Sequence, residues 1–152
     1  MPPDEAVTSR IPHRPPFLWV DRIISYTPGV ITTEKKIPTD LDIFAGHYPG
    51  NPLMPGVLLC EAIFQTGALL MALMQESAEH SSLPGIPVLT RIGGAKFKRS
   101  VYPGDTVEMT VELTETLSSV CFFKGKLRVQ GNIAVQIDFS CASIPPPSPG
   151  QT

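Results

Sequence analysis

Charged residues are scarce in this sequence, and neither sign is in clear excess. Only 17% of the 152 residues are charged, with 12 Lys and Arg against 14 Asp and Glu, so the formal net charge is −2. A nucleic-acid-binding domain usually carries a strong positive field, so nucleic acid is not an expected partner. The low charge also indicates that part of the surface is covered, as it would be in a homo-oligomer.

Cysteine is scarce as well, and its arrangement excludes two common roles. The three cysteines, Cys60, Cys121 and Cys141, are an odd number and show no CxxC spacing. This pattern argues against a disulfide framework and against a zinc site, and it favours a reducing compartment. We therefore expect a cytoplasmic protein, with Cys60 as a small packing residue and not a nucleophile.

The two ends of the chain differ in composition from the rest. Residues 1–10, MPPDEAVTSR, lack the apolar segment of a signal peptide, and we expect them to form a loose leader. Residues 145–152, PPPSPGQT, predict a disordered Pro-rich tail. Between these ends there is no linker and no repeat, and 42% of the chain is hydrophobic. Residues 11–144 are therefore predicted to form a single domain around one core.

One apolar run, residues 57–74, is long enough to span a membrane. It contains Glu61, Gln65 and Thr66, however, and no basic cluster flanks it. The run is rich in Leu, Ala and Met, which favour helix formation. We expect a buried core helix from residue 56 to about residue 75, and no membrane span.

The remaining sequence predicts a sheet. In TVEMTVEL, from residue 106, apolar side chains occupy every second position with polar ones between them, which is typical of a strand with one buried face. Further strand patterns occupy residues 17–26, 30–38, 88–102, 120–130 and 132–143, with turns at TPGV, PGD and GN. A helix that is apolar nearly all round must be surrounded. We therefore predict an α+β layout of hotdog shape, in which one curved, mainly antiparallel sheet wraps around the long central helix.

Chemistry is concentrated around the start of the predicted helix. Glu61 stands among apolar residues, so it must be paired or must have a shifted pKa, and both a structural role and an acid–base role are open. His47, in a segment rich in Pro and Gly, is either satisfied by backbone carbonyls or available as a base. The first amides of the helix, at Gly56 and Val57, lack intrahelical acceptors and carry the positive end of the helix dipole, which suits a developing oxyanion. Together these groups suffice for proton abstraction next to a carbonyl and loss of a hydroxyl.

The same region resembles a known family. GHYPGNPLMPGVLLCEAIFQTGAL is similar to the signature of the β-hydroxyacyl–acyl-carrier-protein dehydratases of FabZ type, although Tyr48 stands where that family usually has Phe. IPHRPPFLWVDRI and AKFKRSVYPGDTVEMTVEL resemble two further segments of the family, so the likeness covers residues 11–143. It implies a hotdog fold, a homodimer as the minimal active unit, assembly into a homohexamer as a trimer of dimers, and no metal or organic cofactor.

The resemblance also implies a reaction and its residues. A (3R)-hydroxyacyl thioester on acyl carrier protein would be dehydrated to the trans-2-enoyl thioester in fatty-acid synthesis. His47 of one subunit would take the proton next to the carbonyl, and Glu61 of the other would protonate the departing hydroxyl. Gly56, with Val57 beside it, would contact the thioester carbonyl. A hotdog acyl thioesterase and a dehydratase of a polyketide or specialised lipid pathway remain as alternatives.

Two further groups of residues have weaker interpretations. Lys96, Lys98 and Arg99 in AKFKRS form either a solvated strand face or a docking patch for the acidic acyl carrier protein. If their strand pairs with the strand 120–130, three more cations would extend this patch: Lys124, Lys126 and Arg128. For His13 and Arg14 we expect a structural role where the domain begins.

Overall fold

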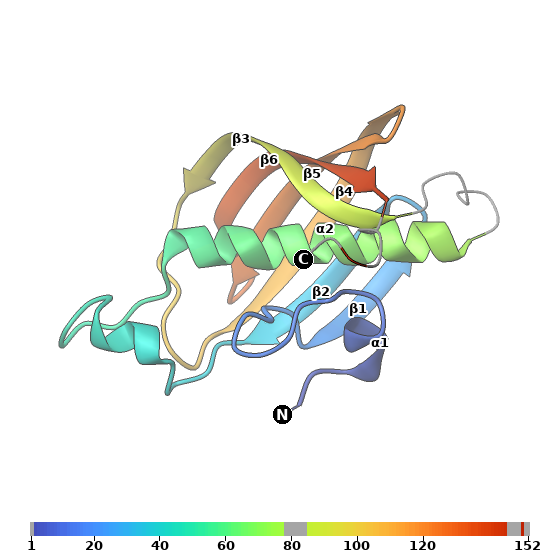
Figure 1. Ribbon diagram of the computed structural model, residues 1–152. Coiled ribbons are helices and arrows are strands. Elements are labelled where there is room, and N and C mark those ends of the chain that lie inside the picture. Colours follow the sequence, from blue (N-terminus) through green and yellow to red (C-terminus); the bar gives the residue numbers. More distant parts are fainter. Residues whose placement is uncertain (1, 78–84, 146–149, 151–152) are drawn as a thin grey trace.

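A computed structural model describes residues 2–77, 85–145 and 150 of the chain. A six-stranded sheet curves around one long helix (Figure 1). The elements in chain order are α1 (Glu5–Thr8), β1 (Arg22–Thr27), β2 (Val30–Lys36), η1 (Asp42–Ala45), α2 (Gly56–Glu76), β3 (Ile86–Phe97), β4 (Thr106–Leu117), β5 (Val120–Val129) and β6 (Asn132–Ile144). Neighbouring strands are all antiparallel, in the order β1-β2-β4-β5-β6-β3. The predicted α+β hotdog arrangement is confirmed.

Helix α2 forms the centre of the core, as its composition predicts. Pro55 occupies the N-cap position, and the helix begins at Gly56. From Leu59 to Met71 every residue is buried except Glu61. By length and composition alone the helix could span a membrane, but 72% of its apolar window is buried inside the fold. Glu61 is only partly buried, so solvent reaches this stretch of the helix at its side chain.

Two glycines allow α2 and the sheet to approach closely. A methyl group at Gly125 of β5 would overlap the side chain of Ile63, and one at Gly67 of α2 would lie 2.8 Å from the ring of Phe139. The alternation predicted for β4 is also present, since Val107, Met109 and Val111 are fully buried against the helix side of the sheet. This close packing fixes the position of α2, and thus of the residues that it carries, against the sheet.

The first strand is shorter than predicted. The sequence pattern suggests a strand over residues 17–26, but β1 begins only at Arg22. Leu18, Trp19 and Val20 are buried, and the backbone of this segment hydrogen-bonds to the side chain of Gln65 on α2. The segment is extended, yet it packs on the helix and does not pair in the sheet. Periodicity cannot distinguish these two kinds of burial.

The N-terminal leader is not loose, which corrects the expectation for residues 1–10. Asp4 caps the short helix α1 by accepting a hydrogen bond from Ala6 N at 3.1 Å, and its own amide donates to Asp21 O at 2.8 Å. Val7 is fully buried. The few apolar residues in this decapeptide show no helical or strand period, so the sequence pattern could not reveal this packing.

At the other end, strand β6 extends to Ile144. The tail expected over residues 145–152 falls largely on residues 146–149 and 151–152, which lie outside the described residues.

Candidate active site

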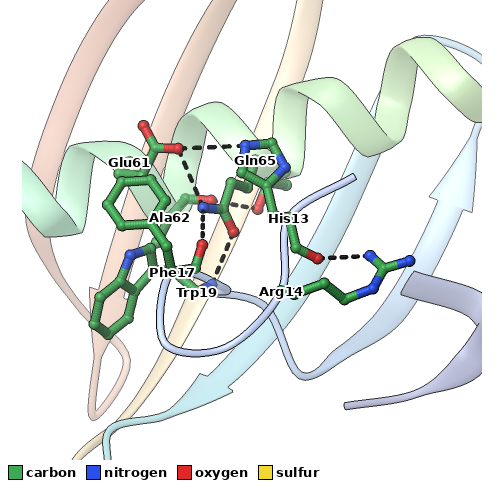
Figure 2. A network of polar contacts seen from close by, with 8 residues as sticks. His13, Arg14, Phe17, Trp19, Glu61, Ala62 and Gln65 are labelled. Atoms are coloured by element: carbon green, nitrogen blue, oxygen red, sulfur yellow. Dashed lines mark hydrogen bonds and ion pairs between the residues drawn. The ribbon is translucent and has the colours of Figure 1, made fainter. Parts of the chain in front are cut away.

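Glu61 lies in the second turn of α2, and its carboxylate is held by polar neighbours on one side (Figure 2). Its side chain is 23% exposed. Gln65 Nε2, one turn further along the helix, donates a hydrogen bond to Glu61 Oε1 at 3.1 Å. His13 Nε2 lies 3.7 Å from the same oxygen, which is an ion-pair distance and not a hydrogen bond. The burial of Glu61 is therefore explained by specific polar contacts combined with partial access to solvent.

Gln65 ties this region of the helix to the N-terminal segment. Its side chain is 1% exposed. Its Oε1 accepts from Trp19 N at 2.8 Å, and its Nε2 donates to Phe17 O at 3.0 Å as well as to Glu61. The sequence placed Gln65 on the same stripe of the helix as Glu61, but the pattern gave no sign that the amide bridges two segments.

His13 and Arg14, for which a structural role was expected, make different contacts. Arg14 does have a structural role: its guanidinium donates to the carbonyls of Ile11, His13 and Thr8 at 2.8, 2.6 and 2.8 Å. These bonds hold the backbone of the segment, and the imidazole of His13 is directed at Glu61 (Figure 2). The family-like motif IPHRPP was the only signal in the sequence that pointed to this residue.

His47 follows η1 in the irregular segment that precedes α2. Its Nδ1 lies 2.8 Å from Leu53 O, and its backbone amide donates to Ile43 O at 2.9 Å. A carbonyl oxygen only accepts hydrogen bonds, so the proton of the neutral imidazole must reside on Nδ1. Nε2 then carries the free lone pair. One nitrogen of His47 is thus bonded to a backbone carbonyl, which was one of the two alternatives expected from the sequence. The same bond leaves Nε2 able to act as a base, which was the other.

His47 and Glu61 do not meet within one chain. Among the described residues, no hydrogen bond or ion pair joins their side chains. The imidazole that approaches Glu61 in the same chain is that of His13.

The start of α2 combines open backbone with exposed apolar surface. No side chain caps the helix, so the amides of Gly56 and Val57 are among the four that lack intrahelical acceptors. A methyl group at Gly56 would lie 2.8 Å from the ring of Phe97 at the end of β3. The Val57 side chain is 74% exposed. The amides predicted for an oxyanion therefore stand beside β3, next to apolar side chains that solvent reaches.

The basic patch is smaller than the sequence allowed. Lys96, Lys98 and Arg99 are exposed at the end of β3, but β3 pairs with β6 and not with β5. The prediction that Lys124, Lys126 and Arg128 on β5 extend the patch through pairing with β3 is therefore wrong. On β5 two of its three cations stand opposite carboxylates of β4, in the pairs Glu108–Arg128 and Glu112–Lys124. Opposite charges in cross-strand positions attract one another, so the positive surface of β5 is largely balanced locally.

The cysteines are placed as packing residues. All three are buried free thiols, and burial raises the pKa of Cys60 and of Cys121. Burial, together with the nearby Cys121 and Glu61, raises the pKa of Cys141 to about 12. A thiol with a raised pKa is a poor nucleophile at neutral pH. Within residues 2–77, 85–145 and 150, no group of three or more His, Cys, Asp or Glu side chains is arranged to hold a metal ion.

Comparison with known sequences places this site in a family context. A family model described as a FabA-like domain matches residues 11–138, a span that includes His13, His47 and Glu61. A protein named 3-hydroxyacyl-[acyl-carrier-protein] dehydratase FabZ from Anaeromyxobacter sp. (strain Fw109-5) is 40% identical over 136 residues, covering 89% of this chain and 85% of that protein. A protein of the same name from Caulobacter sp. (strain K31) is 39% identical over 142 residues, covering 93% of this chain and 85% of its own length.

Solved structures with low sequence identity share the fold. The dehydratase heterocomplex ApeI:P from Xenorhabdus doucetiae superposes with a TM-score of 0.75 at 13% identity, covering 91% of this chain and 90% of that one. A hypothetical thioesterase with coenzyme A from Streptococcus pneumoniae TIGR4 gives a TM-score of 0.62 at 12% identity, with 94% of each chain covered. The same fold thus occurs in proteins with different names, and the position of the side chains must decide the chemistry.

Proposed function

The chain belongs to the FabA-like family, together with the FabZ-type 3-hydroxyacyl-[acyl-carrier-protein] dehydratases, and from this membership we propose its reaction. It dehydrates (3R)-hydroxyacyl thioesters of acyl carrier protein to trans-2-enoyl thioesters, in fatty-acid synthesis. The observation that carries the proposal is the state of His47, whose Nδ1 is bonded to Leu53 O so that Nε2 is free to accept a proton. A location in the cytoplasm agrees with the free thiols, and cell fractionation would test it.

The proposed step uses three groups. Nε2 of His47 takes a proton from C2, next to the thioester carbonyl, and the electron pair left behind forms the C2–C3 double bond. The C3–O bond breaks, and the hydroxyl leaves as water with a proton from Glu61. The amides of Gly56 and Val57 stabilise the negative charge that gathers on the carbonyl oxygen. Return of the His47 proton to Glu61, directly or through solvent, restores the starting state.

We propose that two copies of the chain build this site. Strand β3 is a sheet edge of 12 residues, and it exposes Ile86, Val88, Leu89, Ile92 and Phe97, each between 37% and 56%. A long apolar edge is a template for pairing with another strand. A second copy that adds its own β3 would cover these side chains and would lie next to the start of α2, because Phe97 already touches Gly56. Such an isologous dimer is the unit from which a homohexamer, a trimer of dimers, would assemble.

Sedimentation velocity tests the interface. The wild-type chain is expected to sediment as a dimer or a multiple of it, and Ile92→Lys is expected to shift it to monomer, because the new charge would be buried between the copies. Leu117→Lys is the matched control, since Leu117 is also 55% exposed but lies at the end of β4. A monomeric wild-type protein, or equal effects of both substitutions, would contradict an interface at β3.

We propose that Lys96, Lys98 and Arg99 dock the carrier protein. They flank Phe97, whose ring contacts the start of α2, so a carrier bound there would be close to the Gly56 amide. Attraction between this cluster and an acidic partner would speed their encounter and would weaken with salt.

One assay tests both the reaction and the docking. A 3-hydroxyacyl thioester is supplied either on acyl carrier protein or on a small thiol, and the absorbance of the conjugated enoyl group and the release of thiol are followed together. Enoyl formation without thiol release is expected, with a KM that rises with ionic strength only for the carrier-linked substrate. Thiol release without enoyl formation would indicate a thioesterase instead.

A further inference from the structure

Two side-chain nitrogen atoms converge on one oxygen of Glu61 (Figure 2). Gln65 Nε2 donates to Oε1 at 3.1 Å, and His13 Nε2 lies 3.7 Å from the same atom. Among the described residues, no hydrogen bond or ion pair reaches Oε2. The carboxyl group is thus held through one oxygen, and the other oxygen is left for a substrate.

The position of His13 is built into the fold. Three hydrogen bonds from the Arg14 guanidinium hold the backbone carbonyls of His13 and of two residues before it, Thr8 and Ile11, and Ile11 is 2% exposed. Further upstream, Arg10 forms a bidentate pair with Glu76 at the end of α2, at 2.9 and 3.1 Å. The Arg10 pair therefore attaches the upstream end of the N-terminal segment to α2, whereas the Arg14 bonds fix the backbone at His13 itself.

The surroundings of the His13 ring select one tautomer. Its Nδ1 is buried and has no hydrogen-bond partner among the described residues. A proton on Nδ1 would be a buried donor without an acceptor, and it would leave the lone pair of Nε2 facing a carboxyl oxygen. A proton on Nε2 instead points at that oxygen and leaves only an unpaired acceptor. The geometry therefore favours an Nε2–H directed at Glu61 Oε1.

We propose that His13 is a positioning residue that acts through Glu61, an inference that rests on the proposed dehydration. When Glu61 gives its proton to the departing hydroxyl, negative charge develops on the carboxylate. The N–H groups of His13 and Gln65 stabilise that charge at Oε1 and keep Oε2 directed at the substrate. We expect the separation of 3.7 Å to shorten at that moment, because catalytic hydrogen bonds are often long before substrate binds.

A double-mutant cycle on dehydration kinetics tests this role. His13→Leu is expected to lower kcat by about 10–100-fold, which is the worth of a hydrogen bond to a charged group, and to leave KM within about twofold. In a Glu61→Gln background the same substitution should have no further effect on kcat, since the group it acts through is gone. His13→Gln, which keeps an N–H donor, should recover kcat to within about threefold of wild type. Additive losses, or no recovery with Gln, would overturn the proposal.

Two further arms separate this role from simple structural damage and from failure of the proposed function. Arg10→Gln loosens the upstream end of the same segment without touching the imidazole, and it is expected to keep the wild-type kcat. A loss of kcat equal to that of His13→Leu would show that the effect of His13→Leu is structural and would overturn the proposal.

The ring ¹⁵N shifts of His13 report its tautomer without any turnover. An Nε2–H tautomer that is lost in Glu61→Leu supports the contact, and an Nδ1–H tautomer in the wild type overturns it. Absence of enoyl formation by wild type would instead refute the dehydration itself.

Discussion

His47→Ala is expected to lower kcat by about 10²–10⁴-fold, which is the usual contribution of a positioned general base. The reason is that Nε2 of His47 carries the free lone pair, because Nδ1 is bonded to Leu53 O. Alanine leaves no group at that place to take the C2 proton. Single-turnover formation of the enoyl thioester measures the loss, which corresponds to about 3–5 kcal/mol of barrier.

A matched control for this variant is available at the next residue. Tyr48 stacks on the His47 ring with centroids 4.1 Å apart, and its side chain is 53% exposed. Tyr48→Phe keeps the stacking and removes only the hydroxyl, to which no role is assigned, so it should retain the wild-type kcat. If His47→Ala turned over at the wild-type rate, His47 would have no part in the chemistry.

The local features of this fold could be predicted from the sequence because they depend on short-range patterns. The helix begins at Gly56 and ends at Glu76, as a run of helix-forming apolar residues after Pro55 indicates. The buried alternation of β4 likewise follows from a period of two within one strand. In both cases the residues that carry the signal are neighbours along the chain.

The contacts that shape the site depend on tertiary packing, which leaves no periodic trace. Gln65 joins the backbone of Phe17 and Trp19, which come far earlier in the chain. His13 lies next to Glu61 in a segment that the buried Val7 and the Arg14 bonds hold in place. Each of these contacts involves single residues, whereas a periodic pattern arises only from residues that repeat along the chain.

Strand order explains why the predicted extension of the basic patch was wrong. Basic residues occur on β5 and at the end of β3, but β6 lies between these two strands. The register does align Lys96 with Gln136, and Gln136 with Lys126, across the three strands. Sequence alone does not show which strands are neighbours, so it cannot decide whether cations on separate strands form one surface.

Val57, Glu61 and Gln65 lie along one stripe of α2, and their exposure falls from the start of the helix inward. Successive members of this stripe are four residues apart and so lie on one face of the helix. Val57 is 74% exposed, the Glu61 side chain is 23% exposed, and Gln65 is 1% exposed. The face therefore leads from solvent at the helix N-terminus to the buried amide that holds the carboxylate. A substrate entering beside Gly56 would meet Glu61 at the inner end of the exposed part.

Glu61→Gln is expected to lower kcat by about 10²–10⁴-fold, because an amide cannot deliver the proton that the departing hydroxyl needs. The variant should fold normally, since the new amide keeps an oxygen that accepts from Gln65 Nε2 and removes an ionisable group from a largely buried helix. Kinetics and thermal unfolding are measured on the same sample. Full activity with equal or higher stability would show that the carboxylate has no chemical role.

Mixing the two inactive variants shows whether the site is shared between subunits. If His47 of one chain works with Glu61 of the other, a heterodimer of His47→Ala and Glu61→Gln chains contains one intact site and one doubly altered site. Random pairing of equal amounts would make half of the dimers mixed, so the mixture should regain about one quarter of wild-type activity. If both groups act within a single chain, no dimer in the mixture contains an intact site, and no activity should return. The absence of a contact between His47 and Glu61 among the described residues of one chain favours the first result.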